Sequence, residues 1–168
     1  MRSIRNEQSV GAKKLGSGPL VFMPDGLSMV SVFGDTPLLW TIEDGVIQLE
    51  FNADDYVSSL ATSPDGQILA AGTNLDYPKD RVSIYLWRVS DGKELHKLEF
   101  DGIYISHLGF SPDGRMLLST GPQSINLWDV EQGIRLREWP GNSGFFSLDG
   151  RLIGIVQEGV LTWWGIRP

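Results

Sequence analysis

The chain has 168 residues, of which 41% are hydrophobic and 21% are charged, a composition typical of one folded domain and not of a disordered chain. Its 14 Lys and Arg against 21 Asp and Glu give a net charge of -7, and no basic cluster exceeds the pair Lys13-Lys14, which argues against binding along a phosphate backbone. Cysteine is absent, which excludes disulfides and thiolate metal sites. The N-terminal residues lead into no apolar run, so we expect no signal peptide and no membrane span. We therefore expect a cytoplasmic protein.

One turn phrase recurs four times along the chain. It reads FMPDG, TSPDG, FSPDG and FSLDG, and its aspartate–glycine pairs are Asp25-Gly26, Asp65-Gly66, Asp113-Gly114 and Asp149-Gly150. The aspartates lie 40, 48 and 36 residues apart, which brackets the length of a four-stranded propeller blade. Proline presets φ at the first corner, aspartate bonds the backbone ahead and glycine accepts a positive φ, so we interpret these residues as structural turns and not as a catalytic carboxylate ring.

A tryptophan follows each turn at a nearly fixed distance. The spacing from aspartate to tryptophan is 15 residues in three repeats and 22 in the second, which therefore carries an insertion. The tryptophans of this register are Trp40, Trp87, Trp128 and Trp164. One tryptophan per repeat favours packing between strands over a ligand cage, whereas Trp139 and Trp163 lie outside the register.

Short apolar segments rich in branched and aromatic residues lie between these landmarks. They include residues 67–72, 82–87, 115–120 and 124–128, each bounded by Gly, Pro or Asp, and they predict β-strands that are buried on both faces. The predicted fold class is therefore all-β, a β-propeller of about four four-stranded antiparallel blades. The repeats are expected at residues 16–51, 52–99, 100–139 and 140–168.

The segment from Gly109 to Trp139, GFSPDGRMLLSTGPQSINLWDVEQGIRLREW, resembles the WD-repeat β-propeller family and contains the Trp128-Asp129 pair that names it. The resemblance implies blades with strands a to d from the axis outward, the Pro-Asp-Gly turn between a and b, and the tryptophan at the end of c. The family's Gly-His pair is missing throughout, so we expect its buried His/Ser/Asp network to be absent. A TolB-like propeller is the alternative subfamily.

The two ends of the repeat array are complementary. Residues 9–15 read as a strand d without a, b or c of its own, and the fourth repeat stops before its strand d. If the N-terminal strand fills the last blade, the chain forms a small closed ring. The alternatives are a dimer of half-rings with eight blades, or one segment of a longer array. We favour both of these over a monomeric ring, because four twisted sheets would be strained in a circle.

The insertion in the second repeat is the chain's main non-repeating feature. It spans residues 72–81, GTNLDYPKDR, in a b–c loop that shares one face with the d–a loops. The candidate partner-binding residues are Asn74, Asp76, Tyr77, Lys79, Asp80 and Arg81 in this loop and Asp54, Asp55 and Asp101 on the same face. Tyr77 is an aromatic anchor typical of interfaces, and the carboxylates favour a basic protein or peptide partner. The alternative is a slightly long solvated hairpin.

No motif points to catalysis or to a bound cofactor. His96 and His107 have no second ligand at metal-binding spacing, so we interpret them as structural, and no nucleophile elbow, phosphate loop, zinc-protease or EF-hand pattern occurs. We therefore expect a non-enzymatic protein-interaction scaffold without cofactor or metal, which self-associates if it is a half-ring. The alternative is an accessory or structural propeller segment of a larger enzyme or signalling protein.

Overall fold

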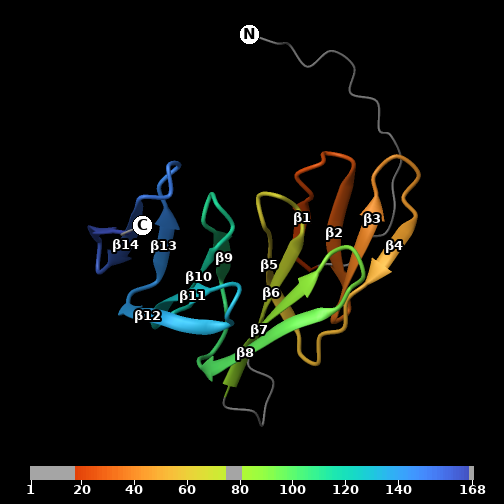
Figure 1. Ribbon diagram of the computed structural model, residues 1–168. Helices are drawn as coiled ribbons and strands as arrows, with labels where there is room; N and C mark the ends of the chain where they lie inside the picture. The colour runs from red at the N-terminus through yellow and green to blue at the C-terminus, as the bar shows by residue number, and fades with distance from the viewer. Residues whose placement is uncertain (1–17, 75–80, 167–168) are drawn as a thin grey trace.

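The computed structural model describes residues 18–74 and 81–166, whose strands form four antiparallel sheets (Figure 1). The first sheet, blade 1, contains β1 (Leu20–Phe22), β2 (Ser28–Phe33), β3 (Thr36–Thr41) and β4 (Ile47–Glu50). Blade 2 contains β5 (Val57–Thr62), β6 (Ile68–Thr73), β7 (Arg81–Arg88) and β8 (Glu94–Asp101). Blade 3 contains β9 (His107–Phe110), β10 (Met116–Thr120), β11 (Ser124–Asp129) and β12 (Ile134–Pro140), and blade 4 contains β13 (Ser143–Phe146), β14 (Leu152–Gln157) and β15 (Val160–Gly165). The predicted all-β propeller fold with about four blades is confirmed.

The blades follow one another in chain order. Within each sheet every strand pairs with its neighbour in sequence, so the strands correspond to a, b, c and d. The first strands contact one another from blade to blade, β1 with β5, β5 with β9, and β9 with β13. Figure 1 shows an open row with blades 1 and 4 at its two ends, which matches a partial propeller and not a small closed ring. The predicted closing strand at residues 9–15 lies outside the described residues.

Each interface between neighbouring blades contains the register tryptophan of the following blade. Its ring contacts an aromatic ring from the end of strand d, or just after it, in the preceding blade. The pairs are Phe51 with Trp87, Phe100 with Trp128 and Trp139 with Trp164, at centroid distances of 5.5, 5.2 and 5.8 Å. Every blade thus has a tryptophan face, which points to the preceding blade, and a receiving face, which points to the following one.

Two of these tryptophans are also held by a hydrogen bond within their own blade. The indole Nε1 of Trp128 donates to Ser119 Oγ at 2.9 Å, and that of Trp40 donates to Ser31 Oγ at 3.0 Å. These tryptophan–serine bonds do not test the expectation that the family's buried His/Ser/Asp network is absent. The hairpin between strands b and c places the serine within reach of the ring, so the indole N–H is satisfied without the Gly-His pair.

The three Pro-Asp-Gly phrases and the Leu148-Asp149-Gly150 phrase of blade 4 form tight turns between strands a and b. Their glycines have φ values of 69°, 71°, 73° and 71°, a conformation that disfavours any side chain. The turns also stack from blade to blade, since the glycines of the second, third and fourth turns each lie against the proline of the preceding turn. A Cβ added to Gly66, Gly114 or Gly150 would lie 3.4, 3.6 or 3.3 Å from the Cδ of Pro24, Pro64 or Pro112.

The aspartate of each turn accepts hydrogen bonds that favour its ionised form. In three turns the pKa of the aspartate lies below the usual 3.8. The main cause is a hydrogen bond from a serine hydroxyl two residues earlier, and the second is the backbone N–H two residues later. The pairs are Ser63 with Asp65, Ser111 with Asp113 and Ser147 with Asp149. At Asp25 the backbone N–H of Leu27 is the main cause of the lowered pKa. The turn carboxylates therefore stabilise the fold only while they are charged.

We expect the free energy of unfolding to fall as the pH drops below the unfolded-chain pKa of 3.8 and through the lower folded-state values. The contribution of each turn is complete above that range, because a folded-state pKa below the unfolded one means that the unfolded chain binds protons more readily. The measurement is the urea midpoint between about pH 6 and about pH 3. Asp113→Asn keeps an oxygen acceptor but does not titrate, so this variant should lose less stability over the range than the parent; parallel curves would contradict the assignment.

Candidate interaction face

The loops that join strands b to c and d to a emerge on one face of the array, which we call the loop face. Asn74, at the end of strand b in blade 2, joins two of these loops. Its backbone N–H donates to the Tyr56 carbonyl at 2.9 Å, and it forms an isolated antiparallel bridge with Tyr104. The predicted loop residue Asn74 therefore connects the d–a segments that precede blades 2 and 3.

Asp54 bonds groups from blade 2 while its side chain stays 72% exposed. Its Oδ2 accepts hydrogen bonds from Lys97 Nζ at 3.1 Å and from the Tyr85 hydroxyl at 3.4 Å, and its backbone N–H donates to the same hydroxyl at 3.2 Å. The Tyr85 hydroxyl and then the Asp54 carboxylate raise the pKa of Lys97 above its usual range. The group is a polar joint between blades 1 and 2.

The other predicted residues of the loop face differ in their access to a partner. Arg81 and Asp101 form an exposed ion pair with Nε and Oδ1 3.5 Å apart, a contact that contributes little to stability in water. Asp55 is only 5% exposed, so its carboxylate does not present a surface charge. Asp76, Tyr77, Lys79 and Asp80 lie outside the described residues.

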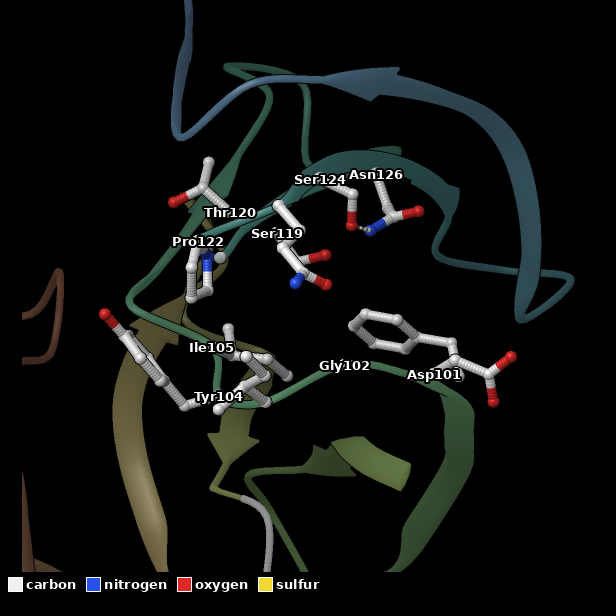
Figure 2. Close-up of a pocket in the computed structure, with 13 residues that line it drawn as sticks. Asp101, Gly102, Tyr104, Ile105, Ser119, Thr120, Pro122, Ser124 and Asn126 are labelled. Carbon is white, nitrogen blue, oxygen red and sulfur yellow. Dashed lines mark hydrogen bonds between the residues drawn. The ribbon is translucent and has the colours of Figure 1, made fainter. Parts of the chain in front are cut away.

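A small cavity lies beneath the loop face between blades 2 and 3 (Figure 2). Its volume is about 20 Å³, which is enough for one water molecule and too small for a cofactor. The buried residues on its wall include Ile105, Ser119, Thr120 and Asn126. Asn126 Nδ2 donates to Ser124 Oγ at 3.2 Å, and its Oδ1 accepts from Arg135, so this polar side chain is already engaged.

The opposite face contains a wider cleft of about 710 Å³ between blades 2 and 3. Carboxylates of Asp65, Asp113, Asp129 and Glu131 border it together with His96. The His96 Nε2 lies 3.0 Å from the Glu131 carbonyl oxygen, a structural contact across the two blades. His107 is exposed on β9. Across the described part of the chain, no three His, Cys, Asp or Glu side chains are placed to hold a metal ion.

Comparison with known proteins identifies the repeats. The family model "WD domain, G-beta repeat" matches residues 45–76 and 92–129. Cilia- and flagella-associated protein 52 of Chlamydomonas reinhardtii is 33% identical over 131 residues, which cover 75% of this chain and 21% of that protein. The human WD repeat-containing protein 90 is 25% identical over 169 residues, 96% of this chain and 10% of that protein.

The chain belongs to the WD-repeat family. A further relative, small ribosomal subunit protein RACK1 of Glycine max, is 42% identical over 76 residues, 45% of this chain and 21% of that protein. This WD-repeat chain thus spans about a fifth or less of the length of these three relatives. Within residues 18–74 and 81–166, no helix has the length and apolar character needed to cross a membrane.

The WD-repeat loop face also carries exposed residues that the sequence patterns did not single out. Tyr56 is 48% exposed, Ile103 46% and Tyr104 43%. Figure 2 shows the Tyr104 ring pointing away from the small cavity, while Ile105 contributes to its wall. The alternation of exposed Tyr104 with buried Ile105 was the available signal, but it is too short to separate an interface residue from an ordinary strand start.

Proposed function

We propose that the chain is a non-enzymatic protein-interaction scaffold that binds its partner through the loop face. The observation that supports this most directly is the joint made by Asn74, which holds the backbone of Tyr56 and Tyr104 in place while both rings remain about half exposed. Tyrosine contributes a large contact area with only two side-chain torsions, so a fixed backbone reduces the entropy lost on binding. Arg81 and Asp101 would form the polar border of this surface.

The partner is a protein or peptide, and its basic side chains would pair with Asp101 and Asp54 at the border. Two carboxylates flank the exposed aromatic side chains, whereas Asp55 is buried and contributes no surface charge. The apolar rings would supply most of the binding energy, because exposed charge pairs contribute little in water. The cytoplasm is the compartment we propose, and the similarity to a small ribosomal subunit protein of Glycine max is compatible with it.

The test is affinity enrichment from a cell lysate with the purified chain as bait. We expect the double variant Tyr56→Ser/Tyr104→Ser to lose at least about tenfold of the enriched partner, as hot-spot tyrosines do. The matched control is Leu27→Ser/Leu148→Ser, which changes exposed side chains in a–b turns on the opposite face. Circular dichroism would verify that both variants fold. Equal retention of partner by the two variants would contradict binding through the loop face.

A further inference from the structure

The sheet face of blade 4 that points away from blade 3 is apolar, and its side chains are about half exposed. Phe145, Leu152, Leu161 and Trp163 are 42%, 40%, 45% and 51% exposed. The strand register places Phe145, Gly154 and Trp163 side by side, and the Phe145 and Trp163 rings meet edge to face with centroids 5.5 Å apart. These side chains point away from Ile153, Ile155 and Trp164, which pack towards blade 3.

This surface is the receiving face of blade 4. In the other three blades the receiving face is buried by the tryptophan face of the next blade. Val30 and Val32 of blade 1 lie in one core with Trp87, Val82 and Ile84 of blade 2 lie with Trp128, and Ile125 and Leu127 of blade 3 pack in the core that contacts Trp164. All six of these aliphatic side chains are 8% exposed or less. In its three strands, blade 4 has the same type of surface, and no neighbouring blade covers it in this structure.

The tryptophan face of blade 1 is the matching surface at the other end of the row. Leu20, Phe22, Phe33 and Ile47 lie on this face, on the same side of the sheet as Trp40, and are 52%, 61%, 54% and 42% exposed. The two end blades thus carry the two kinds of sheet surface that meet at the internal interfaces, although the three-stranded blade 4 has no aromatic ring from a strand d. Apolar surfaces of this kind mark sites of association.

We propose that blade 1 of a second copy of this chain docks its tryptophan face on the receiving face of blade 4. The contact is head to tail, because two different surfaces meet, and each copy offers both of them. In a pair of copies the two contacts form together and close the assembly. The occupant of the blade 4 face is therefore another molecule of the same protein.

The experiment is the solution mass of the purified chain by size exclusion with light scattering. We expect twice the 18.6 kDa mass of one chain. Trp163→Glu at the receiving face and Phe22→Glu at the tryptophan face should each lower the mass to that of a single chain. Leu148→Glu, which adds the same charge at a fully exposed turn position, should leave the dimer intact.

Mixing the two variants distinguishes a head-to-tail contact from a symmetric one. Each variant keeps the surface that the other has lost, so an equimolar mixture should regain a species of twice the single-chain mass, held by one intact contact. A parent chain that is monomeric at about 100 μM would overturn the proposal and assign the face to another occupant. A dimer that resists Phe22→Glu would overturn it equally, because blade 1 would then play no part. Circular dichroism of each variant excludes unfolding as the cause of a lost dimer.

Discussion

Replacement of Trp87 by alanine is expected to lower the free energy of unfolding by about 3–5 kcal/mol, the usual loss for a buried tryptophan. Trp87 is 1% exposed and lies at the interface of blades 1 and 2. Its ring stacks on Tyr85 at 5.2 Å with an interplanar angle of 5°, and it contacts Phe51 at 5.5 Å. Truncation removes these contacts and leaves a cavity that strands from two sheets cannot easily close. The urea midpoint measured by circular dichroism would report the loss.

The control for this prediction is Trp163→Ala, which removes the same side chain from a position that is 51% exposed. Its loss should be less than half that of Trp87→Ala, since burial and not residue type determines the cost. Measurement at low protein concentration keeps any association out of the comparison. Similar midpoints for the two variants would mean that the interface of blades 1 and 2 contributes little to stability.

Gly72→Ala is expected to destabilise the fold by about 1–3 kcal/mol through overpacking. A Cβ at this position would lie 2.5 Å from Ser59 Oγ, 2.6 Å from Ile105 Cγ2 and 2.7 Å from Ile105 Cβ. The serine hydroxyl can rotate, but the Ile105 Cβ is attached directly to the loop that precedes blade 3. That loop must shift, so the substitution should also weaken partner binding through the neighbouring Tyr104.

Gly109→Ala is the matched control, because it also adds a methyl group to a strand glycine. The only neighbouring contact there is His107 Nε2 at 3.5 Å, an ordinary van der Waals distance. This variant should be neutral or slightly more stable than the parent, since alanine reduces the entropy of the unfolded chain. If Gly72→Ala unfolds at the same urea concentration as Gly109→Ala, the close approach of Ile105 to β6 does not constrain the fold.

The repeat length, the strands and the position of the insertion could be predicted from the sequence because they depend on local chemistry. The Pro-Asp-Gly turn and the tryptophan recur at fixed spacing, and each marks a definite point of the blade. Trp139 lies outside this register, because strand d carries no comparable landmark in the sequence. The structure shows it to be the aromatic partner of Trp164, a role determined by packing between blades.

The details of the loop face could not be predicted because they depend on pairing between distant segments. Asp54 and Asp55 are adjacent in sequence and look alike, yet one bonds Lys97, 43 residues further along, and the other is buried. The exposure of Tyr56 and Tyr104 likewise depends on where Asn74 meets them. Such contacts have no signature in a single sequence.

The stacked a–b turns have a consequence for the curvature of the propeller. At each of these contacts the residue without a side chain faces the rigid ring of a proline, so the blades approach more closely there than bulkier residues would permit. Neighbouring blades are therefore closer together at the a–b turns than at the aromatic pairs between their outer strands. We therefore expect the chemistry of this repeated turn to contribute to the angle between neighbouring blades, and with it to the number of blades that completes a circle.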